Sequence, residues 1–229
     1  MTIEGLQKLT LLDFPGRTAC TVFLGGCNFR CPFCHNYDLV AEPSAPLMQE
    51  EELLAFLQKR KGLLDGVAIT GGEPLMRREL PELLRKIKAL GYPVKLDTNG
   101  SFPARLKALV EEGLVDYVAM DVKNSPARYG ETVGFLKLGL GPVQESVEFL
   151  KSGAVDYEFR TTVVQELHGP AELRALAEWL KGAKRYYLQQ FKQSVQVPDE
   201  GLTPPSFQTM QDYLKIVQEL VPAAEVRGI

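Results

Sequence analysis

The strongest constraint in the sequence is a short loop that holds three of its four cysteines. Cys27, Cys31 and Cys34 form the pattern C-x3-C-x2-C within GGCNFRCPFCHN. A zinc ribbon needs two C-x2-C pairs to close a tetrahedron, and no second pair follows. Three thiolates on one loop can instead hold three irons of a 4Fe-4S cluster and leave the fourth iron open. The alternative is a zinc site that adds His35, although the adjacent Cys34 and His35 cannot easily both reach one ion.

Composition limits the remaining possibilities. The chain of 229 residues has a size that one hydrophobic core can support, and its 45% hydrophobic and 24% charged residues are typical of a soluble globule. A net charge of −3 gives no reason to expect nucleic-acid binding. No apolar run approaches ~20 residues, so we expect no membrane span, and no signal peptide is recognised. We therefore expect a cytoplasmic, reducing location, where cysteines are metal ligands more often than disulfides.

Strands and helices alternate six times along the chain. The predicted strands are 18–25, 66–70, 93–96, 115–122, 154–164 and 185–190. The predicted helices are 47–61, 80–90, 103–112, 142–152, 171–181 and a last one capped by Ser206. Short connections in this alternation indicate parallel strands joined by right-handed crossovers. Six units are too few to close an eight-stranded barrel, so we predict an α/β fold with an open, partial (β/α)6 barrel.

The polar clusters of the sequence follow the predicted strands. The cysteine loop follows the first strand, Gly71–Glu73 the second, Asp97 and Thr98 the third, and Asp121–Lys123 the fourth. Functional residues of such folds lie at the carboxyl ends of strands, so these clusters are expected to meet. Cys20 lies inside the first strand instead, and we interpret it as a buried core residue with no metal role.

Several short segments together resemble a known family. The cysteine loop and ITGGEP are typical of the radical S-adenosylmethionine (SAM) superfamily. The segments LLDFPG, KLDTNG, DYVAMDVK and YEFRTTVV resemble the activating enzymes of glycyl-radical proteins, in particular those of anaerobic ribonucleoside-triphosphate reductase. The resemblance runs from residue 5 to about residue 191. It implies a single radical SAM core domain over 1–229, with a short N-terminal extension of 1–17.

The resemblance also implies a reaction. Cys27, Cys31 and Cys34 would hold the 4Fe-4S cluster, and SAM would chelate the open iron. One electron would cleave SAM to methionine and a 5′-deoxyadenosyl radical, which would abstract hydrogen from a glycine of the partner. The implied partners are a glycyl-radical enzyme, the anaerobic ribonucleotide reductase, and a flavodoxin or ferredoxin as electron donor.

Four residues are expected to bind SAM on this basis. Phe33 would pack beside the adenine, and its alternative is simple packing under the loop. Gly71 and Gly72 would bring backbone carbonyls to the SAM amino group, where a Cβ would not fit. Glu73 would add a carboxylate to the same site.

A second set of polar residues follows the later strands. Asp97, Thr98 and Asp121 match positions near the SAM carboxylate that sometimes hold a monovalent cation in related enzymes, and hard oxygen ligands suit such an ion. The alternatives are that Asp97 caps a turn and that Asp121 pairs with Lys123. Lys123 and Arg160 would face the SAM carboxylate or the substrate backbone.

Asp13 precedes Cys27 by fourteen residues. By resemblance it would position the glycine loop of the protein substrate, and its alternative is a turn residue before Pro15. Because only Cys20 remains outside the motif, no auxiliary cluster is expected. The other functions that stay open are a small-molecule radical SAM enzyme like 7-carboxy-7-deazaguanine synthase, and a zinc-binding adaptor.

Overall fold

The computed structural model describes residues 1–41, 46–137 and 139–228, which form two compact units. Unit 1 comprises Met1–Asn28, Asp38–Thr98 and Phe102–Ala119, and unit 2 comprises Phe29–Tyr37, Asn99–Ser101 and Met120–Ile229. Each unit is described by itself below. The cysteine loop passes from unit 1 to unit 2 after Asn28.

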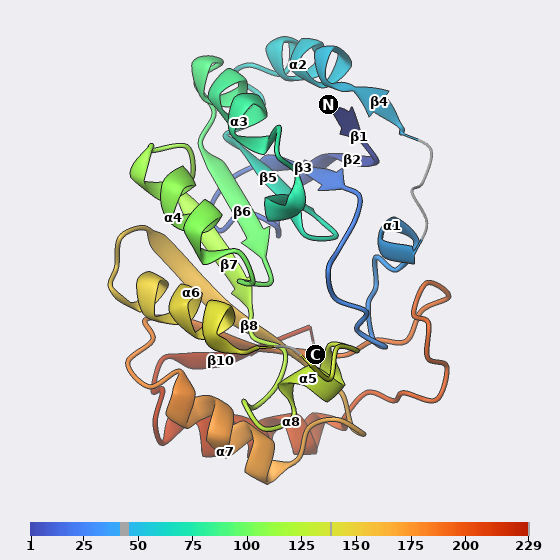
Figure 1. Ribbon diagram of the computed structural model, residues 1–229, viewed down its shortest axis with the longest axis vertical. Coiled ribbons are helices and arrows are strands. Elements are labelled where there is room, and N and C mark those ends of the chain that lie inside the picture. The colour runs from blue at the N-terminus through green and yellow to red at the C-terminus, as the bar shows by residue number, and fades with distance from the viewer. Residues whose placement is uncertain (42–45, 138, 229) are drawn as a thin grey trace. The chain divides into compact units, whose positions relative to one another are not determined.

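Unit 1 is built on a mostly parallel sheet (Figure 1). Its strands are β2 Gly5–Thr10, β3 Ala19–Leu24, β5 Gly66–Gly71, β6 Val94–Thr98 and the start of β7 Tyr117–Asp121. Their order is β7-β6-β5-β3-β2; β3, β5 and β6 run parallel, and β2 pairs antiparallel with β3. The short strands β1 Thr2–Ile3 and β4 Met48–Gln49 form a separate antiparallel pair.

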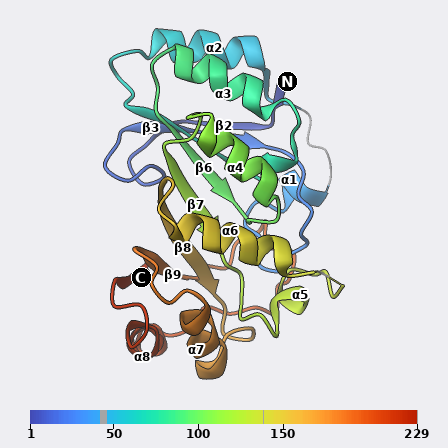
Figure 2. The ribbon, with the colours of Figure 1, turned by 60° about the vertical axis from the view of Figure 1, so that its left-hand side comes forward.

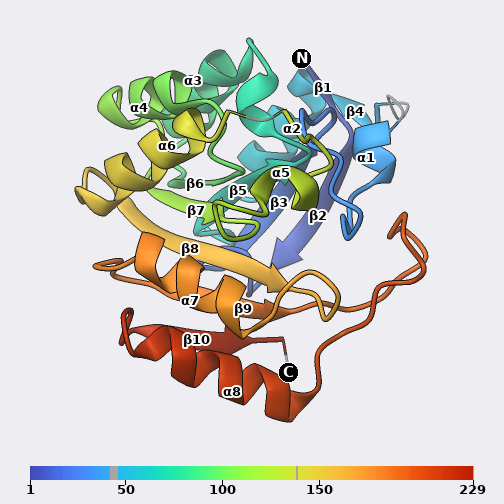
Figure 3. The ribbon, with the colours of Figure 1, turned by 60° about the horizontal axis from the view of Figure 1, so that its bottom comes forward.

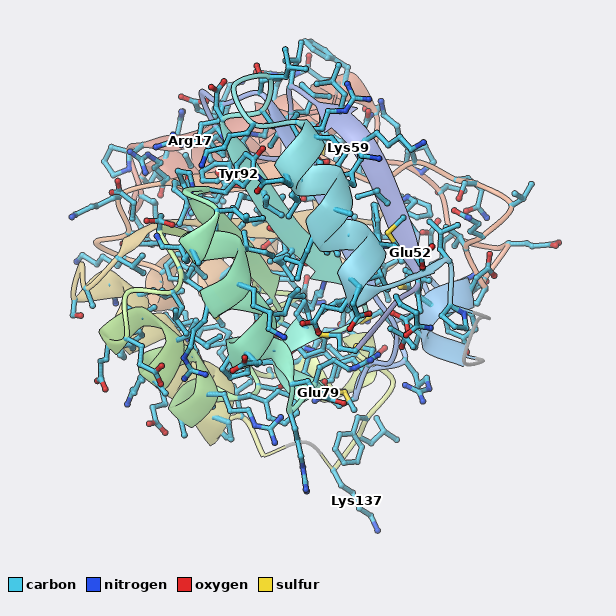
Figure 4. All side chains as sticks on the ribbon, turned by 90° about the horizontal axis from the view of Figure 1, so that it is seen from above. Arg17, Glu52, Lys59, Glu79, Tyr92 and Lys137 are labelled. Carbon is cyan, nitrogen blue, oxygen red and sulfur yellow. The ribbon has the colours of Figure 1, made fainter. Side chains whose placement is uncertain are left out.

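Helices lie on one side of these strands (Figures 1 and 2). They are α2 Glu50–Lys59, α3 Leu80–Ala89 and α4 Pro103–Glu111, with the short α1 Asp38–Ala41 and the 3-10 turn η1 Pro74–Met76 in the connections. Leu53 and Leu57 of α2 and Leu83 and Leu84 of α3 are fully buried, as the amphipathic pattern predicts, while Leu54 is half-buried. Figure 4 shows Tyr92 at the Lys59 end of α2, where its hydroxyl donates to the Leu57 carbonyl at 2.9 Å.

The two faces of the unit 1 sheet differ in polarity. Val22, Ile69 and Leu96 are in register and form a fully buried apolar row. Because neighbouring residues of a strand point to opposite faces, the adjacent row of Thr21, Ala68 and Lys95 lies on the other face. The apolar row suits the side covered by helices, so the polar row belongs to the opposite side of the sheet.

Unit 2 continues the strand–helix alternation (Figure 3). Its strands are β8 Asp156–Val163, β9 Tyr186–Gln190 and β10 Ala224–Arg227, in the order β8-β9-β10 and all parallel. Its helices are α5 Tyr129–Thr132, α6 Gly141–Lys151, α7 Pro170–Trp179 and α8 Phe207–Gln218. Ser206 caps α8 as predicted, since its side chain accepts from the Thr209 N–H at 3.0 Å.

The predicted strands and helices form, within two or three residues of the predicted ends. The sequence reading missed β2 and β10. The segment GLQKLT of β2 carries polar, exposed residues because it is an antiparallel edge strand, and the segment AEVR of β10 is too short to show a period. No helix in the described part of the chain is long and apolar enough to cross a membrane.

Candidate active site

The residues predicted to form the site are divided between the two units. Unit 1 contains Asp13, Cys27, Gly71, Gly72, Glu73, Asp97 and Thr98. Unit 2 contains Cys31, Phe33, Cys34, Asp121, Lys123 and Arg160. The three cysteines stay within eight residues of one another in sequence.

In unit 1 the Gly-Gly segment lies directly against the first part of the cysteine loop. The Glu73 N–H donates to the Gly26 carbonyl at 2.7 Å, and the Gly72 N–H donates to the Leu24 carbonyl at 2.8 Å. A Cβ on Gly72 would lie 2.0 Å from the Gly26 oxygen and 3.3 Å from the Cys27 Cβ. Gly71 has φ +125°, and a Cβ there would meet the Leu24 oxygen at 2.2 Å. Only glycine permits this approach of two backbones.

Glu73 is fully buried beneath this contact. Its Oε1 accepts from the Leu75 N–H at 3.0 Å, which caps η1, and from the Thr98 hydroxyl at 2.8 Å. Hydrogen bonds of this kind offset the cost of burying a carboxyl group. The structure therefore brings Glu73 and Thr98 together, although the sequence analysis assigned them to different groups.

Asp97 lies beside a residue that the sequence analysis missed. The Lys95 ammonium, 1% exposed, donates to an oxygen of the half-buried Asp97. Both residues point to the polar face of the sheet, since they are two apart on β6. A lysine inside a strand with buried apolar neighbours was the sequence signal for this pair.

Asp13 also belongs to the polar face of unit 1. Its Oδ2 accepts from the Thr21 hydroxyl at 2.5 Å, level with the row that contains Lys95. The neighbouring Phe14 ring is buried and packs with Ala19 and Tyr117, the first residues of β3 and β7. The connection between β2 and β3 is thus fixed at the amino ends of β3 and β7. Within it, Asp13 is turned toward the middle of the sheet.

In unit 2 the second part of the cysteine loop is a tight turn with several anchors. The Cys34 N–H donates to the Cys31 carbonyl at 3.2 Å. His35 Nε2 donates to the Lys192 carbonyl at 2.7 Å, so this side chain fixes the loop by a hydrogen bond. The Asp199 N–H donates to the Pro32 carbonyl at 3.3 Å. The polar loop 192–205, which has no recognisable sequence signature, therefore supports the cysteine turn.

Asp121, Lys123 and Arg160 form one ion cluster in unit 2. Lys123 Nζ donates to Asp121 Oδ2 and Arg160 Nε to Asp121 Oδ1, each at 2.9 Å. Burial alone would raise the pKa of Asp121, but the two cations outweigh it and hold that pKa well below its usual range. Asp121 therefore holds two cations at this strand end.

The Lys123 ammonium lies close to the cysteine turn. Lys123 Nζ is 6.0 Å from the centre of the buried Phe33 ring. Burial raises the pKa of the Cys34 thiol, and the Lys123 charge acts against that rise. Burial would lower the pKa of Lys123, but the charges of Asp121 and Cys31 raise it above its usual range. Lys123 is therefore a permanent cation beside the cysteine turn.

The buried His168 holds the Lys123 backbone. It is 1% exposed; its Nε2 donates to the Lys123 carbonyl at 2.9 Å, and its Nδ1 accepts from the Val164 N–H at 3.1 Å. The Asn124 side chain adds a bond to the Leu167 carbonyl at 3.0 Å. These bonds fix the segment after β7, and no sequence pattern predicted them.

The donor set fits a 4Fe-4S cluster in its chemistry. None of the four cysteines is in a disulfide. Gly72 leaves room beside Cys27, and the cation of Lys123 favours thiolates in unit 2. Cys20 differs: it is fully buried, and burial raises the pKa of its thiol to about 12, which confirms its interpretation as a core residue.

Over the described residues, no three His, Cys, Asp or Glu side chains are arranged to hold a single metal ion. A cluster makes a different demand on its ligands, because each thiolate binds a separate iron.

The sequence matches the radical SAM superfamily over residues 21–180, and the chain therefore belongs to this superfamily. Its fold is α/β with a mostly parallel open sheet, like the partial barrels of radical SAM proteins, and the predicted fold class is confirmed. Membership of the superfamily implies a 4Fe-4S cluster and SAM.

Three relatives are similar to this chain. A Methanocaldococcus jannaschii protein, provisionally named a glycyl-radical enzyme activating enzyme, is 30% identical over 99% of this chain and 96% of its own. A 7-carboxy-7-deazaguanine synthase of Halobacterium salinarum is 37% identical over 44% of this chain and 37% of its own. A pyruvate formate-lyase-activating enzyme of Clostridium pasteurianum is 33% identical over 53% of this chain and 52% of its own.

Among solved structures, Streptococcus suis SuiB bound to S-adenosylmethionine is similar in fold. Its TM-score is 0.69 at 11% identity, over 91% of this chain and 52% of that one.

Proposed function

We propose that this protein is a radical SAM activase, which makes a glycyl radical in a partner enzyme. The observation that carries the proposal is the backbone contact of Gly72 with Gly26 and Cys27, because it joins the GGEP segment to the cysteine loop. The relative whose length matches this chain almost throughout bears an activase name, which supports the choice of substrate class. A bound 4Fe-4S cluster, reduced by the electron donor, would supply the one electron that cleaves SAM to methionine and a 5′-deoxyadenosyl radical.

The chain's own residues would prepare this reaction. Cys27, Cys31 and Cys34 would hold three irons, and the Gly71–Gly72 backbone would receive the SAM amino group with Glu73 beneath it. Phe33 would lie against the adenine. Lys123 and Arg160 would offer positive charge to the SAM carboxylate or to the substrate backbone, with Asp121 holding both side chains in place.

Three further assignments belong to the same proposal. Residues 1–229 would act as one radical SAM core, with 1–17 as an extension. Asp13, Asp97 and Thr98 would line the substrate and SAM region, and a monovalent cation near Asp97 or Asp121 is part of this assignment. Both carboxylates accept hydrogen bonds from lysines, so a cation would need to compete with Lys95 and Lys123.

The partner we propose is an anaerobic ribonucleoside-triphosphate reductase, with a flavodoxin or ferredoxin as electron donor. The test begins with anaerobic reconstitution, reduction with dithionite, and electron paramagnetic resonance with and without SAM. We expect a reduced-cluster signal that shifts with SAM, together with 5′-deoxyadenosine formation. Cys31→Ala should lose both, while Cys20→Ala, the matched control outside the motif, should keep both. Stoichiometric zinc with no iron would refute the proposal and favour the zinc adaptor.

The substrate is tested next by adding the reductase and recording a glycyl-radical doublet. A doublet that depends on SAM and disappears when the reductase glycine is changed to alanine would support the activase. A second candidate is a 7-carboxy-7-deazaguanine synthase, which the 37% identity over part of the chain favours. Formation of the deazaguanine product from that enzyme's substrate, with no doublet from the reductase, would favour this second candidate.

A further inference from the structure

Tyr129 carries a buried polar atom with no hydrogen-bond partner. The side chain is 1% exposed, and its hydroxyl makes no hydrogen bond within the described part of the chain. A buried hydroxyl without a partner destabilises a protein, so native structures contain few of them. Its presence calls for a functional explanation.

The ring of Tyr129 is packed against the cysteine turn of unit 2. Its centre lies 6.4 Å from that of Phe29, which precedes Cys31 by two residues, in an edge-to-face arrangement. The following segment continues this contact: the Arg30 N–H donates to the Val133 carbonyl at 2.8 Å, and Gly134 lies so close that a Cβ would be 2.5 Å from the Arg30 oxygen. Helix α5 is therefore fixed against residues 29–31.

The hydroxyl has few possible acceptors in this environment. The Lys123 main chain acts on this oxygen only as a donor, and the Lys123 ammonium can likewise only donate, so neither accepts the hydroxyl proton. The oxygens of Asp121 already accept from Lys123 and Arg160. The contact of the Tyr129 ring with Phe29 and the bond from Arg30 to Val133 hold this side chain against the turn that carries Cys31. The hydroxyl has no sulfur partner in the structure itself, so its acceptor would be a sulfur that a bound cluster brings to the Cys31 side of the turn.

We propose that Tyr129 is a positioning residue that donates a hydrogen bond to a sulfur on the Cys31 side of the cluster and makes the cluster easier to reduce. This inference rests on the proposed function, since it requires Cys31 to be a cluster ligand. A donor at a sulfur stabilises the more negative, reduced state, and hydrogen bonds to sulfurs are one of the levers that set cluster potentials. In the protein without its cluster, the unpaired hydroxyl of Tyr129 would lower the free energy of unfolding.

The test compares wild type with Tyr129→Phe, which removes only the hydroxyl. Tyr157→Phe is the matched control, because Tyr157 is equally buried in unit 2 but its hydroxyl already accepts from the Lys184 N–H at 3.1 Å. Iron and sulfide contents are measured first, and the reduced fraction is then followed by electron paramagnetic resonance in an anaerobic redox titration. Thermal unfolding of the apo-proteins is recorded alongside.

Tyr129→Phe should retain the cluster and lower the ratio of reduced to oxidised cluster about tenfold at a fixed potential, a shift of ~59 mV for one electron. Its apo form should unfold at the same temperature or about 2–4 °C higher, while Tyr157→Phe should leave the potential unchanged and lower the unfolding temperature. An unchanged potential in Tyr129→Phe, or an equal shift in Tyr157→Phe, would overturn the inference alone. A wild-type protein that binds no cluster would overturn both the inference and the proposed function.

Discussion

Replacement of Gly72 by alanine tests the contact on which the proposed site depends. The new Cβ would lie 2.0 Å from the Gly26 oxygen and 2.6 Å from the Gly26 carbonyl carbon. Carbon atoms in proteins do not approach other heavy atoms closer than about 3 Å, so the two backbones would have to separate by about 1 Å. No side-chain rotation can relieve this overlap, because the atoms that it meets belong to the backbone.

The expected cost follows from the size of that displacement. Overpacking of this kind destabilises a protein by about 1–3 kcal/mol, which lowers the unfolding temperature by roughly 2–12 °C for a chain of this length. A misplacement of about 1 Å in a reacting site costs on the order of 100-fold in rate. We therefore expect the Gly72→Ala protein to fold, to unfold earlier, and to form 5′-deoxyadenosine about 100-fold more slowly.

The control for this experiment is Gly141→Ala at the start of α6, where a Cβ would meet no atom within 4 Å. It should be neutral or stabilising by about 0.4–1 kcal/mol and should leave the rate unchanged. Thermal unfolding of apo-protein, iron content and the nucleoside assay are measured on both variants. Wild-type unfolding temperature and rate in Gly72→Ala would refute the close approach of the two segments.

Two further predictions concern the support of the site in unit 2. Asp121→Asn removes the carboxylate that pairs with both half-buried cations, Lys123 and Arg160, and should lower the free energy of unfolding by about 3 kcal/mol, measured by denaturant titration. Glu131→Gln, whose ion pair with Arg128 is more exposed, should cost under about 1 kcal/mol; equal losses would contradict the argument. Burial lowers the pKa of His168 from 6.5, so the unfolded chain binds its proton first as pH falls, and stability should decrease below pH 6.5 by up to about 1.4 kcal/mol per pH unit. His168→Gln should abolish that slope, and an unchanged slope would refute the assignment.

Much of the architecture could be predicted because its determinants are local. Strands such as 66–70 and helices such as 80–90 can be recognised from the spacing of their apolar residues and from the glycines at their ends. The alternation of strands and helices along the chain then indicates the fold class. The edge strand β2 escaped prediction because its partner, β3, lies about ten residues further along and its own residues are polar. The spacing of apolar residues can be recognised within one segment, but the strand with which that segment pairs cannot.

In the candidate site too, motifs of contiguous residues could be predicted, whereas contacts between residues far apart in sequence could not. The cysteine turn and the Gly-Gly segment are contiguous in sequence, and each is visible as a motif. Their contact, and the bond from Thr98 to Glu73, join residues 25 or more apart and appear only in the fold. His168 had no signal at all, because its role depends on the Lys123 carbonyl, 45 residues away.

Lys95 is a buried charged residue within a strand, and its position in the sequence is informative because such burial is costly. Burying an ammonium is costly, and replacing a buried ion pair by apolar residues is often neutral or stabilising, so packing alone does not explain Lys95 or its partner Asp97. The pair lies on the face of unit 1 away from the apolar row, in the same row as Thr21, which holds Asp13. Lys95, Asp97 and Thr21 therefore share the face of the sheet opposite the apolar row. In the proposed function Asp13 and Asp97 line the substrate region, so we expect a polar ligand to bind along that row.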